Sequence, residues 1–407
     1  MTYVEFFDKN SIENVCACLT MLPKEVILVG SDKTVMERHC EICEKLFQDR
    51  GQEVKFSCRS VSKWSTSKVV ETIEDILKTY EDCEFGITGG DEMVIFALGI
   101  VCERNREKNI QVHKINIQNN TICDCDMDGT KIAEGSPVLS VEENVRIYGG
   151  STSSYEWILD SDFEADVKTI WEICKKNPTS WNAQIGVFNT IQKRGTITTD
   201  ELTMSARIDD LEQYYRKHDG TYHINPAIKN LLMEKKLVTK LEEVDGVITV
   251  SFKNAQVKKC LTTAGQALEM KIYLTAKKLK DKKDNSNIYN DVRTGVTIDW
   301  DGKDASATNE VDVINEIDVL MMHNMIPVFV SCKNGAVTAD ELYKLNTVSE
   351  RFGGKYAKKV LVSSVLQNLY NGEDLKQRAK DMNIKIITDD DLMDDKQLEN
   401  KLKNMWS

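Results

Sequence analysis

The sequence predicts an α/β protein with two to three domains in its 407 residues. Strand and helix patterns alternate in the first third, helices followed by a hairpin pattern occupy the middle, and a second alternating unit fills the last third. Alternation of this kind is typical of a parallel sheet with right-handed crossovers. We place the domains at residues 1–150, 151–262 and 263–407.

The first domain is expected to be a doubly wound parallel sheet. Apolar runs typical of buried strands lie at residues 25–30, 53–58 and 84–88. Apolar residues at helical spacing follow each run, over residues 33–50, 67–80 and up to 103. Three further short segments have β-like patterns, at residues 113–117, 121–126 and 144–148.

The middle domain is predicted to be winged-helix-like. A helix pattern over residues 227–234 precedes two β-like segments at residues 237–244 and 247–252. Asp245-Gly246 between them is a strong signal for a two-residue hairpin turn. Modules of this kind bind DNA or act as spacers, and because acidic side chains here balance the basic ones, we favour the structural role.

The last domain is predicted to be a further α/β unit. A helix pattern covers residues 264–280 and a charged loop follows it. Strand patterns lie at residues 311–320, 326–333 and 359–363, and a helix pattern lies at 338–352. From residue 389 the chain is charged, which predicts a terminal helix with a solvated face.

Charge and composition exclude several classes of function. The net charge of −12 argues against a general nucleic-acid binder, so any contact with nucleic acid is expected on one face only. No apolar run approaches the roughly 20 residues of a membrane span, and the first ten residues do not have the pattern of a signal peptide. We therefore expect a cytoplasmic protein whose twelve cysteines are reduced. The patterns GxGxxG after the first strand, GxxxxGK[ST], HExxH and GxSxG are absent.

Two loops of the first domain are candidates for a ligand site. Each follows a strand pattern and precedes a helix pattern, where free backbone N–H groups favour phosphate. The residues concerned are Gly30, Ser31, Asp32, Lys33 and Thr34 in one loop, and Thr88, Gly89, Gly90 and Asp91 in the other. Two tight, capped turns would have the same pattern, so a phosphate or nucleotide site is one of two interpretations.

Acidic residues and a lysine in the last domain could carry hydrolytic chemistry. Period-two alternation places Glu316 and Asp318 on one face of their strand, and Ser331 and Lys333 on one face of the next. If the strands are neighbours, Asp318 and Lys333 meet near one end of the sheet. A carboxylate for Mg²⁺ or Mn²⁺ beside a lysine is the layout of a metal-dependent phosphodiesterase. A solvated acidic face with a surface salt bridge is the alternative.

Two glutamates elsewhere in the domain could complete such a site. Glu269 lies beside the apolar stripe of the predicted helix 264–280, from which it could reach a metal, although an ordinary exposed glutamate is the alternative. Glu341 stands in the pattern Thr338-Ala339-Asp340-Glu341, which predicts a capping box and therefore a structural role for its carboxylate.

Six segments of the chain resemble the CRISPR ancillary nucleases, CARF-domain effectors of type III CRISPR immunity. Three segments are similar to the nuclease domain of that family: NEIDVL at residues 315–320, PVFVSCKNG at 327–335 and RFGG at 351–354. GQALE at residues 265–269 is similar to its glutamate-bearing helix, and the two loops of the first domain resemble its ligand-binding motifs.

The resemblance implies a homodimer with an N-terminal Rossmann-like CARF domain and a C-terminal restriction-endonuclease-like, PD-(D/E)xK domain. A cyclic oligoadenylate, most often cyclic tetra-adenylate, would bind across the CARF dimer and activate cleavage of single-stranded DNA or RNA, with nicking of duplex DNA in some members. Glu269 and Asp318 would hold Mn²⁺ or Mg²⁺, and Lys333 would act on the water or the phosphate.

The chain departs from the family pattern at two places. Ser331 occupies a metal-binding position where the pattern has an acid, and Glu316 and Glu341 are the candidates to supply the missing carboxylate. Asp91-Glu92 stands where a basic or neutral pair is commoner, which favours backbone contacts with the ligand. Two other functions stay open: a ligand-responsive nucleic-acid-binding regulator without nuclease activity, and a CARF domain that itself cleaves its activator.

Overall fold

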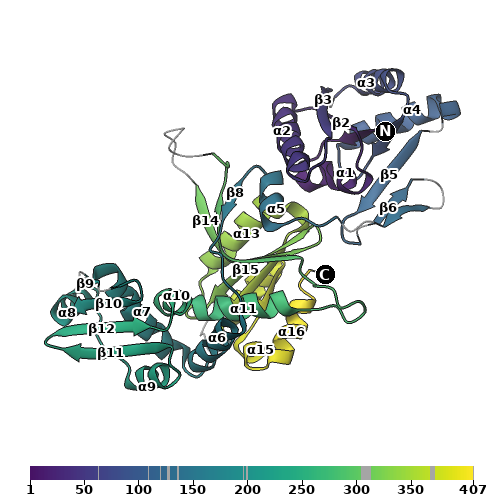
Figure 1. The fold of residues 1–407 in the computed structure, drawn as a ribbon. Helices are drawn as coiled ribbons and strands as arrows, with labels where there is room; N and C mark the ends of the chain where they lie inside the picture. The colour runs from purple at the N-terminus through teal and green to yellow at the C-terminus, as the bar shows by residue number, and fades with distance from the viewer. Residues whose placement is uncertain are drawn as a thin grey trace.

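Three β-sheets organise the chain in the computed structural model, each with its own covering helices (Figure 1). The structure describes all residues except 63, 109, 120, 126–128, 135–136, 196, 199, 304–312, 367–371 and 407. The first sheet comes from residues 2–134 and the second from residues 197–252. The third comes from residues 291–387 together with the short strand β8, Ser151–Ser153.

The first sheet has seven strands in the order β3-β2-β1-β4-β5-β6-β7. Strands β1 to β5 pair in parallel, and β6 and β7 extend the edge in antiparallel fashion. Their bounds are Thr2–Phe6, Glu25–Gly30, Lys55–Ser60, Cys83–Gly86, Gln111–Asn116, Thr121–Asp124 and Lys131–Glu134. The central strand β1 is absent from the sequence prediction, because Glu5 interrupts its short apolar run.

Helices cover both faces of this sheet as the alternation predicts. They are α1 Cys16–Met21, α2 Lys33–Asp49, α3 Thr66–Thr79 and α4 Glu92–Arg104, with the short 3-10 helices η1 Ser11–Asn14 and η2 Arg106–Lys108. The predicted strand at residues 144–148 is wrong: this segment lies in helix α5, Val141–Ile147. Ser140 and Glu143 form a capping box at its start, and this local start signal favours a helix over a strand.

The middle sheet has four antiparallel strands in the order β11-β12-β10-β9. They are β9 Ile197–Thr198, β10 Thr203–Arg207, β11 Val238–Val244 and β12 Val247–Phe252. Asp245 and Gly246 both have positive φ, 51° and 73°, as the predicted tight hairpin turn requires. The surrounding helices are α7 Pro178–Arg194, α8 Ile208–Lys217, α9 Pro226–Glu234 and α10 Ala255–Thr262.

The third sheet has the strand order β17-β16-β15-β14-β13-β8. Its long strands are β13 Asp291–Asp299, β14 Ile314–His323, β15 Ile326–Lys333, β16 Lys358–Ser363 and β17 Ile384–Ile387. The helices are α6 Ser161–Cys174, α11 Gln266–Lys278, α13 Ala339–Gly353, α14 Gly372–Asp381, α15 Asp389–Met393 and α16 Asp395–Lys403, with the 3-10 turn η3 Gly354–Tyr356. Residues 311 and 312, at the start of the predicted strand 311–320, lie outside the described residues.

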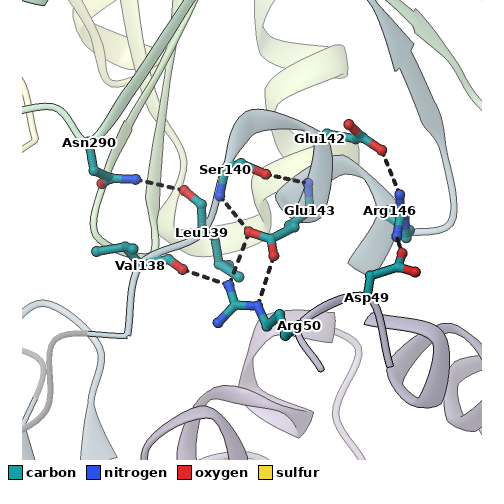
Figure 2. A network of polar contacts seen from close by, with 9 residues as sticks. All are labelled: Asp49, Arg50, Val138, Leu139, Ser140, Glu142, Glu143, Arg146 and Asn290. Carbon is teal, nitrogen blue, oxygen red and sulfur yellow. Dashed lines mark hydrogen bonds and ion pairs between the residues drawn. The ribbon is translucent and has the colours of Figure 1, made fainter. Parts of the chain in front are cut away.

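The first and third sheets share one continuous hydrophobic cluster, which includes Ile12 and Cys16 from the first domain and Phe329 and Phe352 from the last. Polar contacts through α5 reinforce the junction (Figure 2). Arg50, just after α2, contacts both carboxylate oxygens of Glu143 at 2.8 and 3.0 Å and donates to the Val138 carbonyl oxygen at 2.7 Å. The first domain is therefore attached to the third through helix α5.

None of the twelve cysteines forms a disulfide bond in the structure, and seven of them are buried. None of the helices in the described part of the chain combines the length and the hydropathy that a membrane crossing needs.

Candidate functional site

Strands β14 and β15 are neighbours, and they bring Asp318 and Lys333 together. Antiparallel pairing runs up to Val319 opposite Val330, so Asp318 lies just beyond the last pair. Its Oδ2 accepts hydrogen bonds from the Cys332 backbone N–H at 2.6 Å and from the Ser331 hydroxyl at 3.3 Å. Lys333 Nζ lies 4.0 Å from the same oxygen. Asp318, in the middle of β14, and the last residues of β15 thus form one small polar cluster, beside a cavity of about 70 Å³.

Glu341 joins this cluster, contrary to the predicted capping box. Thr338 is the N-cap residue of α13, but its side chain accepts no capping hydrogen bond. The Glu341 carboxylate instead lies 2.9 Å from Lys333 Nζ and 3.7 Å from Lys344 Nζ. Burial alone would raise the pKa of Glu341, but the contacts with these two lysines lower it. Glu341 is therefore ionised and positions Lys333.

Lys333 is held in its charged form. Burial alone would lower its pKa, but the carboxylates of Asp318 and Glu341 outweigh burial and raise it. The side chain is 28% exposed, so it is not sealed from solvent.

Glu269 approaches the cluster from helix α11 and is buried, with 9% of its surface exposed. Gln266 Nε2 donates a hydrogen bond to its carboxylate at 3.1 Å. Burial raises its pKa well above the ordinary value, and the negative charges of Asp318 and Glu316 raise it further. The helix begins after Gly265, whose φ of 82° favours glycine, and a Cβ there would lie 3.1 Å from Glu269 Oε1.

The chemistry of these carboxylates fits a hard divalent cation. Glu269 and Asp318 are oxygen donors in a half-enclosed place, where burial raises the pKa of each, and repulsion from neighbouring acids adds to the shift. Glu316, two residues before Asp318 on β14, is exposed. Among the described residues no three histidine, cysteine or acidic side chains are already arranged as a ligand cluster.

A larger cavity of about 810 Å³ lies at the carboxyl ends of the first sheet's parallel strands. Of the nine residues predicted there, the five that line it are Gly30, Ser31, Asp32, Gly90 and Asp91. The other four are absent from its lining. Among these, the Thr88 hydroxyl accepts a hydrogen bond from the Ile115 backbone, and Gly89 packs so tightly that a Cβ would lie 2.6 Å from that of Asp8.

The helix-capping interpretation also holds for part of these loops. Asp32 accepts a hydrogen bond from the Val35 N–H at 3.1 Å, and Asp91 accepts one from the Met93 N–H at 3.0 Å. Gly90, with φ of 105°, directs its N–H to Asp8 Oδ2 at 3.3 Å. These three carboxylates accept hydrogen bonds from backbone N–H groups that were expected to be available to a phosphate.

Sequence reasoning missed a third loop and two arginines. Residues 7–11, which follow the unpredicted strand β1, line the cavity beside the two expected loops. Recognition of β1 would have placed this loop at the same sheet edge. Arg38 of α2 and Arg351 of α13 also line the cavity, and no sequence pattern joins these distant residues.

The carboxylate–lysine cluster lies in an α/β domain that is attached to a second α/β domain with a mainly parallel sheet. Residues 258–405 match the family model of the Card1-like endonuclease domain. The resemblance to the CRISPR ancillary nucleases is thereby confirmed.

Two solved structures share the architecture over the whole chain. Protein VC1899 from Vibrio cholerae is 17% identical, with a TM-score of 0.74 over 100% of this chain and 97% of its own. Can2 from Sulfobacillus thermosulfidooxidans, solved in complex with cyclic tetra-adenylate, is 16% identical, with a TM-score of 0.68 over 100% and 99%. No protein of curated function matches the sequence.

Proposed function

We propose that this protein is a metal-dependent endonuclease activated by a cyclic oligoadenylate, with cyclic tetra-adenylate as its activator and single-stranded DNA or RNA as its substrate. The observation that carries the proposal is the contact of Asp318 with Lys333 at the point where β14 and β15 separate, with the buried Glu269 near enough for the charge of Asp318 to raise its pKa. In this proposal the protein acts as a homodimer in type III CRISPR antiviral defence, where it also nicks duplex DNA.

Glu269 and Asp318 are the residues that would hold Mn²⁺ or Mg²⁺, with Ser331 and Glu316 beside them. When bound, the ion polarises the phosphoryl group and lowers the pKa of its water. The Cys332 N–H and the Ser331 hydroxyl orient the Asp318 carboxylate. Lys333 stabilises negative charge that develops on the phosphate, and Glu341 fixes the position of its ammonium group at 2.9 Å.

The cavity of the first domain is the proposed activator site. Its volume of about 810 Å³ and its place at the carboxyl ends of parallel strands support a nucleotide ligand. A ring with two-fold symmetry suits a dimer built on one two-fold axis. For the ligand to activate cleavage, it must bind the active arrangement of the dimer more tightly than the inactive one.

A cleavage assay tests the proposal directly. Single-stranded DNA, RNA and supercoiled plasmid are incubated with Mn²⁺ or Mg²⁺, with each cyclic oligoadenylate in turn, and with EDTA as the control. We expect cleavage only when metal and ligand are both present. Lys333→Ala should abolish it, whereas Lys359→Ala, which removes a half-buried lysine from the adjacent strand β16, should not. Equal cleavage by wild type and Lys333→Ala would refute the proposed site.

The alternative of a DNA-binding regulator has less support. Two basic side chains of the winged-helix-like module pair with acids: Lys240 lies 2.6 Å from Glu242 and Lys235 lies 3.1 Å from Glu234. A regulator would bind duplex DNA in a ligand-dependent and steeply salt-dependent manner without cutting it. Linear products from incubation with ligand alone would indicate that the CARF-like domain cleaves its activator.

A further inference from the structure

An arginine of the nuclease domain lines the ligand cavity of the first domain. Arg351 stands in the last turn of α13, a helix of the third sheet, yet it lines the same cavity as Arg38 of α2. The two side chains are close enough for the charge of Arg38 to act on Arg351. A feature of the C-terminal domain therefore forms part of the wall against which a ligand of the N-terminal domain would lie.

The two guanidinium groups are arranged as an anion site. Arg38 Nη2 donates only to backbone carbonyl oxygens, those of Gly149 at 3.3 Å and Asp301 at 3.2 Å. Arg351 lies over the ring of Phe352 at 5.1 Å. Within the described ranges, neither group makes an ion pair with a carboxylate. Burial and the nearby positive charge of Arg38 both lower the pKa of Arg351, so an anion placed between the two would relieve an unfavourable pair.

Among the described residues, no acidic residue of the cavity wall forms an ion pair with either arginine. Asp32 and Asp91 cap helices α2 and α4. Asp8 accepts hydrogen bonds from the backbone of Asn10 at 2.7 Å and of Gly90 at 3.3 Å. Glu92, in the first turn of α4, is the remaining acid of the lining.

We propose that Arg38 and Arg351 together bind a phosphodiester group of the cyclic oligoadenylate, so that the nuclease domain itself holds part of the activator. This inference rests on the proposed function, because it assigns residues to the ligand of that same cavity. A guanidinium fork matches the geometry of phosphate oxygens better than an ammonium group does.

Helix α13 then joins the two sites. Glu341 lies in its first turn against Lys333, and Arg351 lies in its last turn, about 15 Å further along at 1.5 Å per residue. The turn after the helix is fixed to the third cavity loop, because the Lys355 N–H donates to Asn10 Oδ1 at 3.2 Å. Lys355 Nζ also lies 2.8 Å from Glu13. An anion that binds Arg351 therefore contacts α13, the same helix whose Glu341 positions Lys333 of the nuclease site.

The test measures binding to the full-length protein by calorimetry. Cyclic tri-, tetra- and hexa-adenylate are titrated into wild type, Arg351→Gln, Arg351→Lys and the control Arg106→Gln. Arg106 is an exposed arginine of the first domain that pairs with Glu103 and lies outside the cavity lining. We expect Arg351→Gln to bind about ten- to a hundredfold more weakly, with a smaller loss for Arg351→Lys and none for Arg106→Gln. The affinity of Arg351→Gln should also depend less on salt than that of wild type.

The possible outcomes distinguish a failure of this inference from a failure of the proposed function. If wild type binds one of the rings and Arg351→Gln binds it within twofold, the inference is wrong and the proposed function stands. Equal losses for the lysine and glutamine variants would indicate lost packing on Phe352, and would also overturn it. If wild type binds none of the three rings, the proposed activator is wrong and the inference fails with it. Should Arg351→Gln not fold, Arg351→Lys decides the question: a weaker affinity with the salt dependence of wild type supports the inference, and an unchanged affinity overturns it.

Discussion

The contact between Glu341 and Lys333 offers the sharpest test of the nuclease site. Glu341→Gln keeps the size of the side chain and removes its charge. In the structure this carboxylate lies 2.9 Å from Lys333 Nζ, while Asp318 lies 4.0 Å from it. The change therefore removes the nearer of the two carboxylates that hold the lysine, and it leaves Asp318 in place.

The expected magnitude follows from the type of contact. A hydrogen bond to a charged group contributes about 1.5–3 kcal/mol, and a value near this range applies because less than a third of either side chain is exposed. At about 1.4 kcal/mol per tenfold change, losing it should slow cleavage roughly ten- to a hundredfold. The pKa of Lys333 should also fall, since Glu341 is one of the charges that raise it. The alkaline limb of the pH–rate profile then moves to lower pH.

The assay measures the single-turnover cleavage rate against pH, at saturating metal and cyclic tetra-adenylate. Asp340→Asn is the matched control, because Asp340 precedes Glu341 in the same first turn of α13, is exposed, and does not line the small cavity. We expect the control to keep both the rate and the profile of wild type. A wild-type rate and an unshifted alkaline limb for Glu341→Gln would show that the carboxylate does not position the lysine.

Three further predictions concern charge and stability. Glu269→Gln should raise the Tm of the metal-free protein at pH 7, because burial and nearby acids disfavour the charge of Glu269. The same change should abolish metal-dependent cleavage and the Tm increase that Mn²⁺ produces. Thermal melts with and without Mn²⁺ check the two Tm effects. Arg50→Ala should lower the free energy of unfolding by about 1–3 kcal/mol at pH 7. Burial alone would raise the pKa of Glu143, but the contact with Arg50 lowers it. In urea titrations, the difference in unfolding free energy between wild type and Arg50→Ala should therefore shrink as the pH falls from 4.5 through that lowered pKa. A difference that stays constant with pH would contradict this prediction. Burial, with the charge of Glu13, raises the pKa of Glu5, so Glu5→Gln should raise the Tm at pH 7 but not at pH 4, and a lower Tm at pH 7 would count against this.

Local patterns predicted much of the fold correctly. The runs at residues 25–30, 247–252 and 326–333 are strands with those bounds, because each combines β-branched residues with clear stop signals. The hairpin at Asp245-Gly246 follows from two residues that tolerate positive φ. The sequence pattern does not predict strand β1, because Glu5 interrupts its short apolar run. It does not predict helix α5 either, because the short apolar pattern there resembles a strand and the capping box before it was not recognised.

The candidate sites divide in the same way. Strand periodicity places Asp318 and Lys333 on polar faces, and the structure brings these two side chains together. The role of Glu341 was misjudged, because the pattern of a capping box describes only its own turn and contains no information on Lys333. The place of Arg351 in a cavity of the first domain has no signal in the sequence at all.

By itself, the sequence determined which segments are strands and helices and which residues share a face, because these depend on the period of neighbouring residues along the chain. Only the tertiary structure decided that α13 spans from the carboxylate–lysine cluster to the ligand cavity. That arrangement depends on contacts between residues hundreds of positions apart, such as Arg38 with Asp301, and long-range packing of this kind is set by the shape of the whole folded core.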